Sequence, residues 1–249
     1  MKKYDAGRWE DTELSPPDET SLRLIVNDVE IVTIQCSPDS YEELGAGFLF
    51  TNRIIDDISD IGDIRFSSAD NSLFIRVKKD RFRIPDRLII TTGFGGGPAF
   101  SPEPDGGCVT AGAGFRPDQI IRLMSAMKRQ ALKYQRSGGI HATAICTAAD
   151  IVYLAEDVGR QNSMDKVIGR CLLSGVASGG KALLTTGRIS YEMVMKAGRA
   201  GISVLASLSA PTLKAVEHAE ICGISVVGYV TCDGLLVYSH EHRLTDPVE

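Results

Sequence analysis

Apolar and polar residues alternate in short runs along the first third of the chain, which is the two-residue period of half-buried β-strands. Asn27 and Asp28 separate the first two runs and are residue types that a two-residue hairpin turn favours. The strands expected here are residues 22–26, 29–34, 64–66, 73–77 and 88–92. The residues before position 20 contain little apolar material and are expected to form a loose arm.

Two helix signals interrupt this pattern. Ser40 precedes Glu43 by three positions, the spacing of a capping box, and predicts a helix through Leu49. Pro117, followed by apolar residues at helical spacing from Ile120 to Tyr134, predicts the best-defined helix of the chain. Between the two helices, residues 93–114 are rich in glycine and predict no regular structure.

The second half of the chain alternates between strand-like and helix-like stretches. The expected strands are residues 140–147, 151–155, 182–186, 203–207, 225–229 and 235–238, and the expected helices are residues 164–173, 192–200 and 214–222. This order predicts a mixed sheet flanked by helices, an α/β layered domain at residues 111–249. A smaller β-rich domain of α+β type is expected at residues 1–110, followed by a glycine-rich loop at 93–114.

Composition excludes several classes of protein. A net charge of −5 argues against a protein that coats nucleic acid. No stretch approaches the roughly 20 apolar residues of a membrane span, and the charged start of the chain is unlike a signal peptide. The six cysteines lie far apart without a C-x-x-C pair, so reduced thiols and a cytoplasmic location are expected, with neither nucleic acid nor membrane as partner.

Four polar loops follow predicted strands or helices, where ligand sites of α/β sheets lie. They are residues 137–141, 156–162, 185–190 and 207–212. Free backbone N–H groups in these loops, together with Arg160 and Arg188, predict a pocket for an anionic ligand that bears phosphate. The alternative for each residue is structural. Asp157, Asn162 and Ser190 could cap helices, the arginines could form surface ion pairs, and His141 could be a satisfied, partly buried histidine.

The same region resembles the FdhD/NarQ family, the accessory sulfurtransferases of formate dehydrogenase. The resemblance runs from Ser137 to Gly228. It rests on the stretches GGIHATA, EDVGRQNSMDKVIG, TTGRISYEMVMKAGRAGI and SLSAPTLKAVEHAEICGISVVGY. In the N-terminal half, residues 43–49 (ELGAGFL) are similar to a further element of the family.

The resemblance implies a cytidine-deaminase-like α/β/α fold for the C-terminal domain. It implies transfer of sulfur from a cysteine desulfurase to the molybdenum (or tungsten) bis-molybdopterin guanine dinucleotide cofactor. The catalytic subunit of formate dehydrogenase would receive that cofactor, GDP would be an analogue of the bound ligand, and the protein would be a homodimer.

The ligand site is expected at the polar loops and in a stretch after the last long strand. The candidate residues are His141, Glu156, Asp157, Arg160, Asn162, Lys166, Arg188, Ser190, Tyr229, Val230, Thr231, Cys232, Asp233 and Gly234. Arg160 and Arg188 would pair with phosphates, and an acidic side chain such as Asp157 could accept from a guanine edge. No metal ligands are predicted.

The chain departs from the family at the residues that carry sulfur. The family's C-x-x-C positions correspond to Phe94 and Gly97, and neither can carry sulfur. Cys108 is the thiol left in this segment, so it is either a displaced persulfide carrier or a cysteine without a role. Gln161 replaces a histidine of the family and Thr231 replaces a basic residue. The four cysteines in apolar contexts are expected to pack as small apolar side chains: Cys36, Cys146, Cys171 and Cys222.

Three other functions compete with sulfur transfer. A zinc nucleotide deaminase needs H-x-E and a later P-C-x-x-C, but Ala142 and Thr143 follow His141 and no C-x-x-C exists. A cofactor-binding chaperone without sulfurtransferase activity would explain the missing cysteine pair. A general purine-nucleotide binder would use the same anionic pocket.

Overall fold

A computed structural model describes residues 1–13, 15–78, 88–90, 98–100, 109 and 114–245. Its N-terminal elements are β1 (Lys2–Asp5), β2 (Arg8–Asp11), β3 (Thr20–Val26), β4 (Val29–Cys36), α1 (Tyr41–Thr51), a 3₁₀ turn (Ile58–Asp60), β5 (Ile61–Ser67), β6 (Ser72–Val77), β7 (Leu88–Ile90) and β8 (Pro98–Phe100). The following elements are α2 (Pro117–Gln130), α3 (Leu132–Ser137), β9 (His141–Cys146), β10 (Ile151–Asp157), α4 (Arg160–Leu173), β11 (Ala182–Thr185), α5 (Tyr191–Arg199), β12 (Val204–Ser207), α6 (Leu213–Cys222), β13 (Ser225–Gly228), β14 (Leu236–Val237) and a 3₁₀ turn (Glu241–Arg243).

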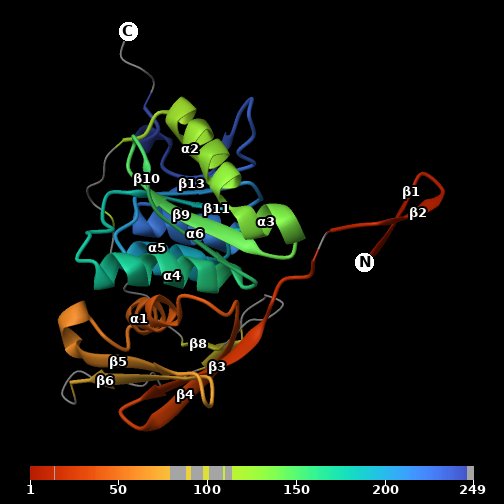
Figure 1. The fold of residues 1–249 in the computed structure, drawn as a ribbon. Helices are drawn as coiled ribbons and strands as arrows, with labels where there is room; N and C mark the ends of the chain where they lie inside the picture. Colours follow the sequence, from red (N-terminus) through yellow and green to blue (C-terminus); the bar gives the residue numbers. More distant parts are fainter. Residues whose placement is uncertain (14, 79–87, 91–97, 101–108, 110–113, 246–249) are drawn as a thin grey trace.

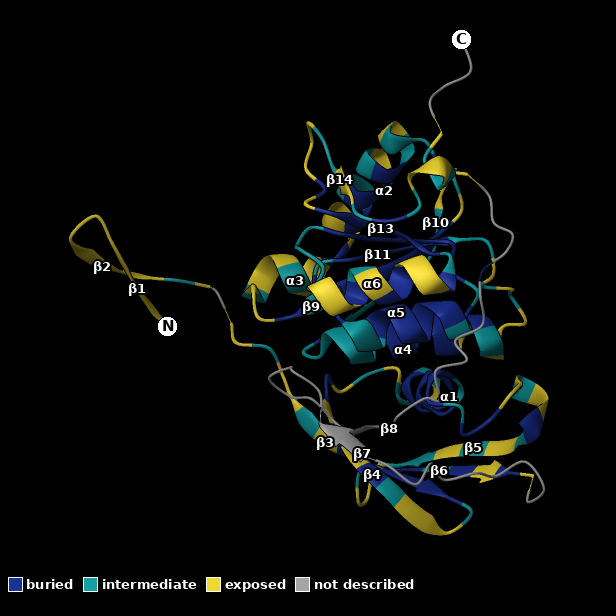
Figure 2. Cartoon of the chain, turned by 180° about the vertical axis from the view of Figure 1, so that it is seen from behind, coloured by how far each residue is buried: buried dark blue, intermediate teal, exposed yellow. Residues whose placement is uncertain are grey.

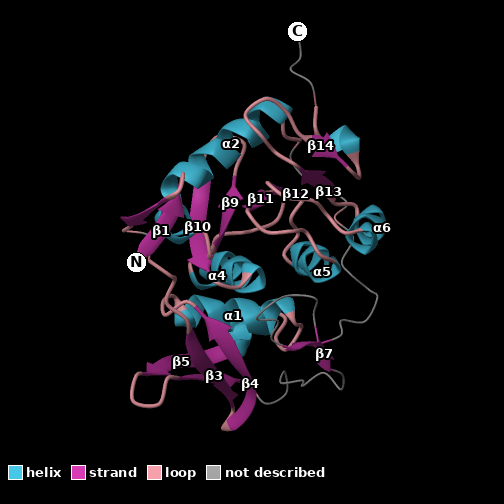
Figure 3. Cartoon of the chain, turned by 90° about the vertical axis from the view of Figure 1, so that its right-hand side faces the viewer, coloured by secondary structure: helices cyan, strands magenta, loops and turns pink. Residues whose placement is uncertain are grey.

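The elements stack in layers (Figure 1). A six-stranded sheet, in the order β10-β9-β11-β12-β13-β14, carries α2 on one face and α4, α5 and α6 on the other. Helix α1 lies on the outer side of α4 and covers a four-stranded sheet in the order β4-β3-β6-β5. Figure 3 shows the same layers from the side. The α/β/α part agrees with the fold class expected from the alternating pattern.

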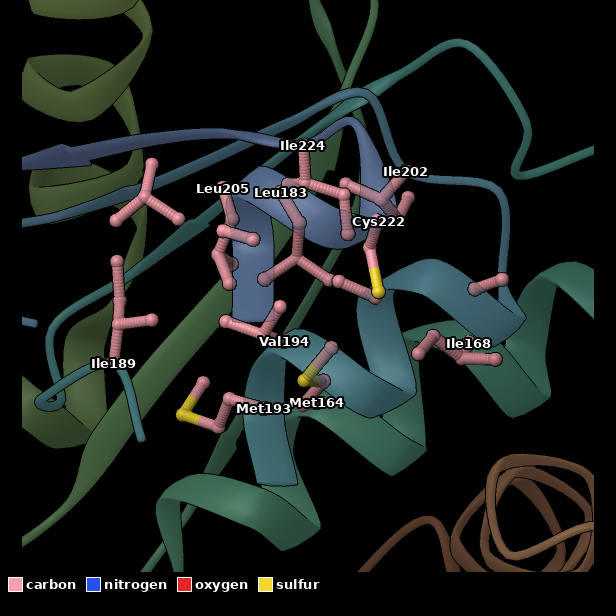
Figure 4. Close-up of a cluster of buried hydrophobic side chains, with 14 of the residues drawn as sticks. Met164, Ile168, Leu183, Ile189, Met193, Val194, Ile202, Leu205, Cys222 and Ile224 are labelled. Atoms are coloured by element: carbon pink, nitrogen blue, oxygen red, sulfur yellow. The ribbon is translucent and has the colours of Figure 1, made fainter. Parts of the chain in front are cut away.

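Side-chain alternation along the central strands builds both cores of the large sheet. Leu183 and Leu205 belong to the cluster beneath α4, α5 and α6, where they pack with Met164 and Val194 (Figure 4). Their neighbours in sequence, such as Leu184, belong to the cluster beneath α2. Burial on both faces explains why these strands are continuous apolar runs.

The direction of the strands gathers several loops at one edge of this sheet. Strands β11, β12 and β13 are parallel, and β9 is antiparallel to both β10 and β11. The carboxyl ends of β10, β11, β12 and β13 therefore lie at the same edge as the start of β9. All four predicted polar loops end or begin at this edge.

Glycines allow α1 and α4 to pack backbone against backbone. A Cβ atom at Gly47 would lie 1.9 Å from the carbonyl oxygen of Asp165, and one at Gly169 would lie 1.9 Å from that of Glu43. Gly45, on the other side of α1, would place a Cβ atom 2.3 Å from the side chain of Leu73 in β6. Helix α1 is thus fitted closely between the two sheets, and Figure 2 shows it almost fully buried.

A buried polar contact accompanies this packing. The hydroxyl of Thr51 in α1 donates to Asp165 Oδ1 at 2.8 Å, and Lys196 of α5 forms an ion pair with Oδ2. Burial raises the pKa of Asp165, and the attraction of Lys196 opposes that rise. Asp165 therefore connects three helices.

Most predicted elements are present, with three differences. Ser40 precedes α1 but has a left-handed backbone (φ 51°) and makes no side-chain cap, so the expected capping box is absent. The helix expected through Tyr134 ends at Gln130, and α3 follows it. The arm expected before residue 20 contains the β1–β2 hairpin. The predicted domain boundary at 110/111 lies outside the described residues.

None of the described helices is both long and apolar enough to cross a membrane.

The close approach of α1 to α4 predicts a large effect of one methyl group. We expect Gly169→Ala to lower the free energy of unfolding by roughly 2 kcal/mol or more, because the new Cβ atom meets backbone that cannot move aside. Helix propensity alone would predict a gain of about 1 kcal/mol. Urea unfolding followed by circular dichroism measures the difference.

Gly62→Ala is the matched control, because a Cβ atom there has only one ordinary contact, at 3.7 Å. A Gly169→Ala protein as stable as this control would contradict the packing described for α1 and α4.

Candidate functional site

The start of β9 and the loop after β11 meet at the shared edge of the large sheet. His141 lies opposite Asp157 in the β9–β10 ladder, and Thr143 lies opposite Thr185 in the β9–β11 ladder. The hydroxyl oxygen of Thr186 accepts a hydrogen bond from Ala142 N at 3.0 Å and lies 3.3 Å from His141 Nδ1. The sequence-predicted loops are therefore neighbours in space.

Gly187 lets His141 and Arg160 approach each other. A Cβ atom at Gly187 would lie 2.8 Å from Arg160 Cβ and 3.2 Å from His141 Nδ1. Its N–H donates to Thr185 Oγ1 at 3.2 Å, and its carbonyl accepts from Ser207 Oγ at 2.6 Å. The glycine of the TTGR stretch thus positions two candidate site residues.

The site is electropositive. Burial and the charges of Arg160 and Arg188 lower the pKa of His141, so its imidazole is neutral near pH 7. Burial and the repulsion of Arg188 also lower the pKa of Arg160, while Glu192 opposes this effect. Arg188 itself is exposed. Two guanidinium groups that repel each other favour an anion between or beside them.

Three buried polar atoms at this edge have no hydrogen-bond partner within the described part of the chain. They are Arg160 Nε, Ser190 Oγ and Glu192 Oε2. Ser190 precedes α5 and makes no side-chain cap, so the capping role considered for it is not observed. A buried polar atom left unpaired costs about 1–3 kcal/mol, so these atoms indicate a ligand that supplies both acceptors and donors.

Asp157 lies beside this group but has partners for both carboxylate oxygens. Oδ1 accepts from Gly159 N at 2.8 Å and from Asn162 Nδ2 at 2.9 Å. Oδ2 accepts from Ser37 N at 3.0 Å and forms a 2.7 Å ion pair with Lys166 Nζ. Its predicted contact with a guanine edge stays a prediction.

Lys166 and Asn162 join the segment after β4 to α4. Lys166 Nζ lies 2.8 Å from Asp39 Oδ1, and Asn162 Nδ2 donates to Gln35 O at 2.8 Å. Burial works against the charge of Lys166, but the attraction of Asp157 and Asp39 is larger and raises the pKa of Lys166. In this structure these side chains connect the two sheets rather than facing the unpartnered atoms.

Glu156 binds the start of α3. Its carboxylate accepts from Lys133 N at 3.2 Å and from Tyr134 N at 2.6 Å. A cavity of about 240 Å³ lies next to this helix, between the residues before β3 and the loop after β4. Pro17, Arg136 and Ile140 contribute to its walls.

The candidate stretch after β13 forms a turn at the same edge of the sheet. Tyr229 is half exposed with a left-handed backbone (φ 50°), and its N–H donates to Ser209 O at 3.2 Å. Val230 is buried, and Thr231 Oγ1 accepts from the N–H groups of Asp233 and Gly234 at 3.3 and 3.2 Å. Cys232, at the tip, is exposed.

The other described cysteines are buried. Burial raises the pKa of the Cys36 and Cys146 thiols to about 12 and that of Cys171 to about 11, so these thiols are poor nucleophiles near pH 7. Cys222 Sγ lies 3.1 Å from His218 Nε2 inside the core. All four lie in the core as predicted.

Cys108, Phe94 and Gly97 lie outside the described residues. The described residues contain no group of three or more His, Cys, Asp or Glu side chains that could hold a metal ion.

Sequence reasoning missed three polar residues that belong to this region: Ser37, Asp39 and Glu192. Ser37 and Asp39 are more than 110 residues from their partners in α4, so no local pattern reveals them. Glu192 had a signal, because it follows Arg188 in the first turn of a predicted helix.

Comparison with known proteins gives a consistent result. The sequence profile of the FdhD/NarQ family matches residues 17–245. A sulfur carrier protein FdhD of Listeria innocua is 33% identical over 98% of this chain and 97% of its own length. A sulfur carrier protein FdhD of Bacillus licheniformis is 32% identical over 97% and 94%.

A solved structure shares the fold. It is a Desulfotalea psychrophila protein, provisionally described as a formate dehydrogenase accessory protein, with a TM-score of 0.78 and 22% identity over 98% of this chain and 97% of that one. The profile match spans nearly the whole chain, including every loop of the candidate site described above. The chain therefore belongs to the FdhD/NarQ family.

Proposed function

We propose that this protein takes part in the maturation of formate dehydrogenase by binding the guanine-dinucleotide form of the molybdenum or tungsten cofactor at the sheet edge. The names of its relatives, sulfur carrier proteins and a formate dehydrogenase accessory protein, support the general role. The unpartnered atoms of Arg160 and Glu192 support the site.

The chemistry of these two residues suits a guanine nucleotide. Arg160 Nε is a donor and Glu192 Oε2 is an acceptor, so the ligand must offer an acceptor and a donor. A phosphate supplies the acceptor, and a guanine base supplies N–H donors on the edge that carries its amino group. Adenine has a hydrogen in place of that amino group. The pair thus predicts a preference for guanine over adenine.

The remaining residues of the edge complete this assignment. Arg188 would add a second positive charge toward a pyrophosphate, and the neutral His141 would offer a hydrogen bond without a further charge. Ser190 Oγ can donate to or accept from the ligand. The bound cofactor would be the acceptor of sulfur.

Sulfur transfer requires a thiolate on this chain. We propose Cys108 as the carrier, with Cys232 as the alternative because it is the exposed thiol among the described residues. The thiolate attacks the outer sulfur of a persulfide on a cysteine desulfurase. One S–S bond forms as the other breaks, and the thiolate of the desulfurase leaves.

The other parts of this proposal follow from the family. The cysteine desulfurase and the catalytic subunit of formate dehydrogenase are the proposed partners, in the cytoplasm. The second candidate function is a chaperone that binds the cofactor without carrying sulfur. It is favoured by the residues at the family's two cysteine positions, Phe94 and Gly97.

Nucleotide titration tests the site. We expect the wild-type protein to bind GDP more tightly than ADP, and Glu192→Gln to reduce that preference about tenfold by removing a charged acceptor. Arg160→Gln should weaken both nucleotides to a similar extent, because phosphate is common to them. Isothermal titration calorimetry measures all four affinities.

Glu217→Gln, on the exposed side of α6, is the control and should bind as the wild type does. Equal affinities of the wild-type protein for GDP and ADP would contradict the site.

Persulfide mapping tests sulfur transfer. After incubation with a cysteine desulfurase and cysteine, we expect the mass of the protein to increase by one sulfur atom. Cys108→Ala should abolish this increase, and Cys232→Ala should leave it unchanged, because only a carrier thiolate accepts the sulfur. Intact mass spectrometry with and without reductant gives the result.

An adduct that persists in Cys108→Ala and disappears in Cys232→Ala would assign the carrier to Cys232. No adduct in the wild-type protein, together with GDP binding, would support the chaperone.

A further inference from the structure

The N-terminal hairpin stands apart from both sheets (Figures 1 and 2). Strands β1 and β2 pair only with each other, around a turn in which Ala6 and Gly7 both have positive φ, 46° and 86°. Every residue of both strands is exposed. Trp9 is 70% exposed and Tyr4 is 61% exposed, with ring centroids 5.1 Å apart.

Such a hairpin is unusual as a free element. An isolated two-stranded hairpin is marginally stable in water, and each of its outer edges presents unpaired backbone groups. Exposed large aromatic side chains that lie side by side indicate an interaction surface. The hairpin therefore calls for a partner along one edge.

The charges distinguish the two edges. On β1, Lys2 pairs with Asp11 at 2.8 Å and Lys3 pairs with Asp5 at 2.6 Å. On β2, neither Arg8 nor Glu10 forms an ion pair with any other described residue. The β2 edge thus retains one positive and one negative side chain for a partner, and they flank Trp9.

The backbone of Trp9 also faces the free edge. Asp5 and Arg8 close the two-residue turn, and Thr12 N donates to Met1 O at 2.9 Å at the other end. Hydrogen-bonded and non-hydrogen-bonded pairs alternate along an antiparallel ladder, so the Tyr4–Trp9 pair is of the second kind. The N–H and C=O groups of Trp9 therefore point away from β1.

A second copy of β2 fits this edge in one register. Two antiparallel strands related by a two-fold axis place opposite each other residues whose numbers differ by an even number, because opposite side chains share a face. Centring the axis on Trp9 places Arg8 opposite Glu10 of the second copy and Trp9 opposite Trp9. Centring it on Arg8 or Glu10 would place like charges opposite each other, which is destabilising.

We propose that β2 is a self-association surface, on which two copies of this chain pair their β2 strands antiparallel about Trp9 and form a four-stranded sheet. The occupant is a second copy because the unpaired charges and the outward backbone groups of β2 complement their own two-fold image. This interface is independent of the function proposed for the sheet edge.

Trp9 reports on this interface directly, since it is the one tryptophan in the sequence. We expect its fluorescence emission to shift to shorter wavelength as the protein concentration rises, because the indole leaves water in the dimer. The shift should follow the monomer–dimer equilibrium measured by analytical ultracentrifugation. A dimer whose Trp9 emission stays that of an exposed indole, or a protein that stays monomeric, would overturn the proposal.

Charge reversal tests the register. Arg8→Glu and Glu10→Arg should each weaken dimerisation about tenfold, because symmetry creates two like-charge pairs. The double variant restores opposite charges and should recover the wild-type affinity. Lys3→Glu, on β1, is the control and should dimerise as the wild type does. Single variants that dimerise normally, or a double variant that is no better than either single one, would contradict the pairing of β2.

Discussion

The contact between α1 and α4 determines the arrangement of the rest of the molecule. Gly47 and Gly169 remove the side chains that would separate these helices, so backbone meets backbone. This contact brings the small sheet beneath α1 against the α/β/α layers. It also places the loop after β4 beside the first turns of α4, where Ser37 and Asp39 reach Asp157 and Lys166. The start of α4 is therefore held by residues from both halves of the chain.

This arrangement divides the polar side chains of the sheet edge into two groups. On the side of the small sheet, Asp157 has its charge and its hydrogen bonds satisfied within the chain. On the side of the loop after β11, buried atoms of Arg160, Ser190 and Glu192 have no partner among the described residues. Groups of the first kind stabilise the fold, since removing one member of a buried pair exposes the other. Groups of the second kind are available to a ligand, and the positive charge around His141 favours an anionic one.

The sequence predicted the order of strands and helices well, because burial on one or both faces of an element leaves a periodic pattern. It located the edge where the loops meet, since strand direction follows from the alternation of elements. It did not separate Asp157 from Glu192, because their partners lie far away in sequence. It also missed the β1–β2 hairpin, in which every residue is exposed and no apolar period exists. The capping box expected at Ser40 did not form, because its backbone is left-handed there.

A crystal structure of the protein with GDP tests the central claim, that the unpartnered atoms at the sheet edge hold a guanine nucleotide. The account predicts the phosphates beside Arg160 and the amino edge of guanine at the carboxylate of Glu192. GDP bound at another surface, with Arg160 Nε and Glu192 Oε2 still unpaired, would contradict it.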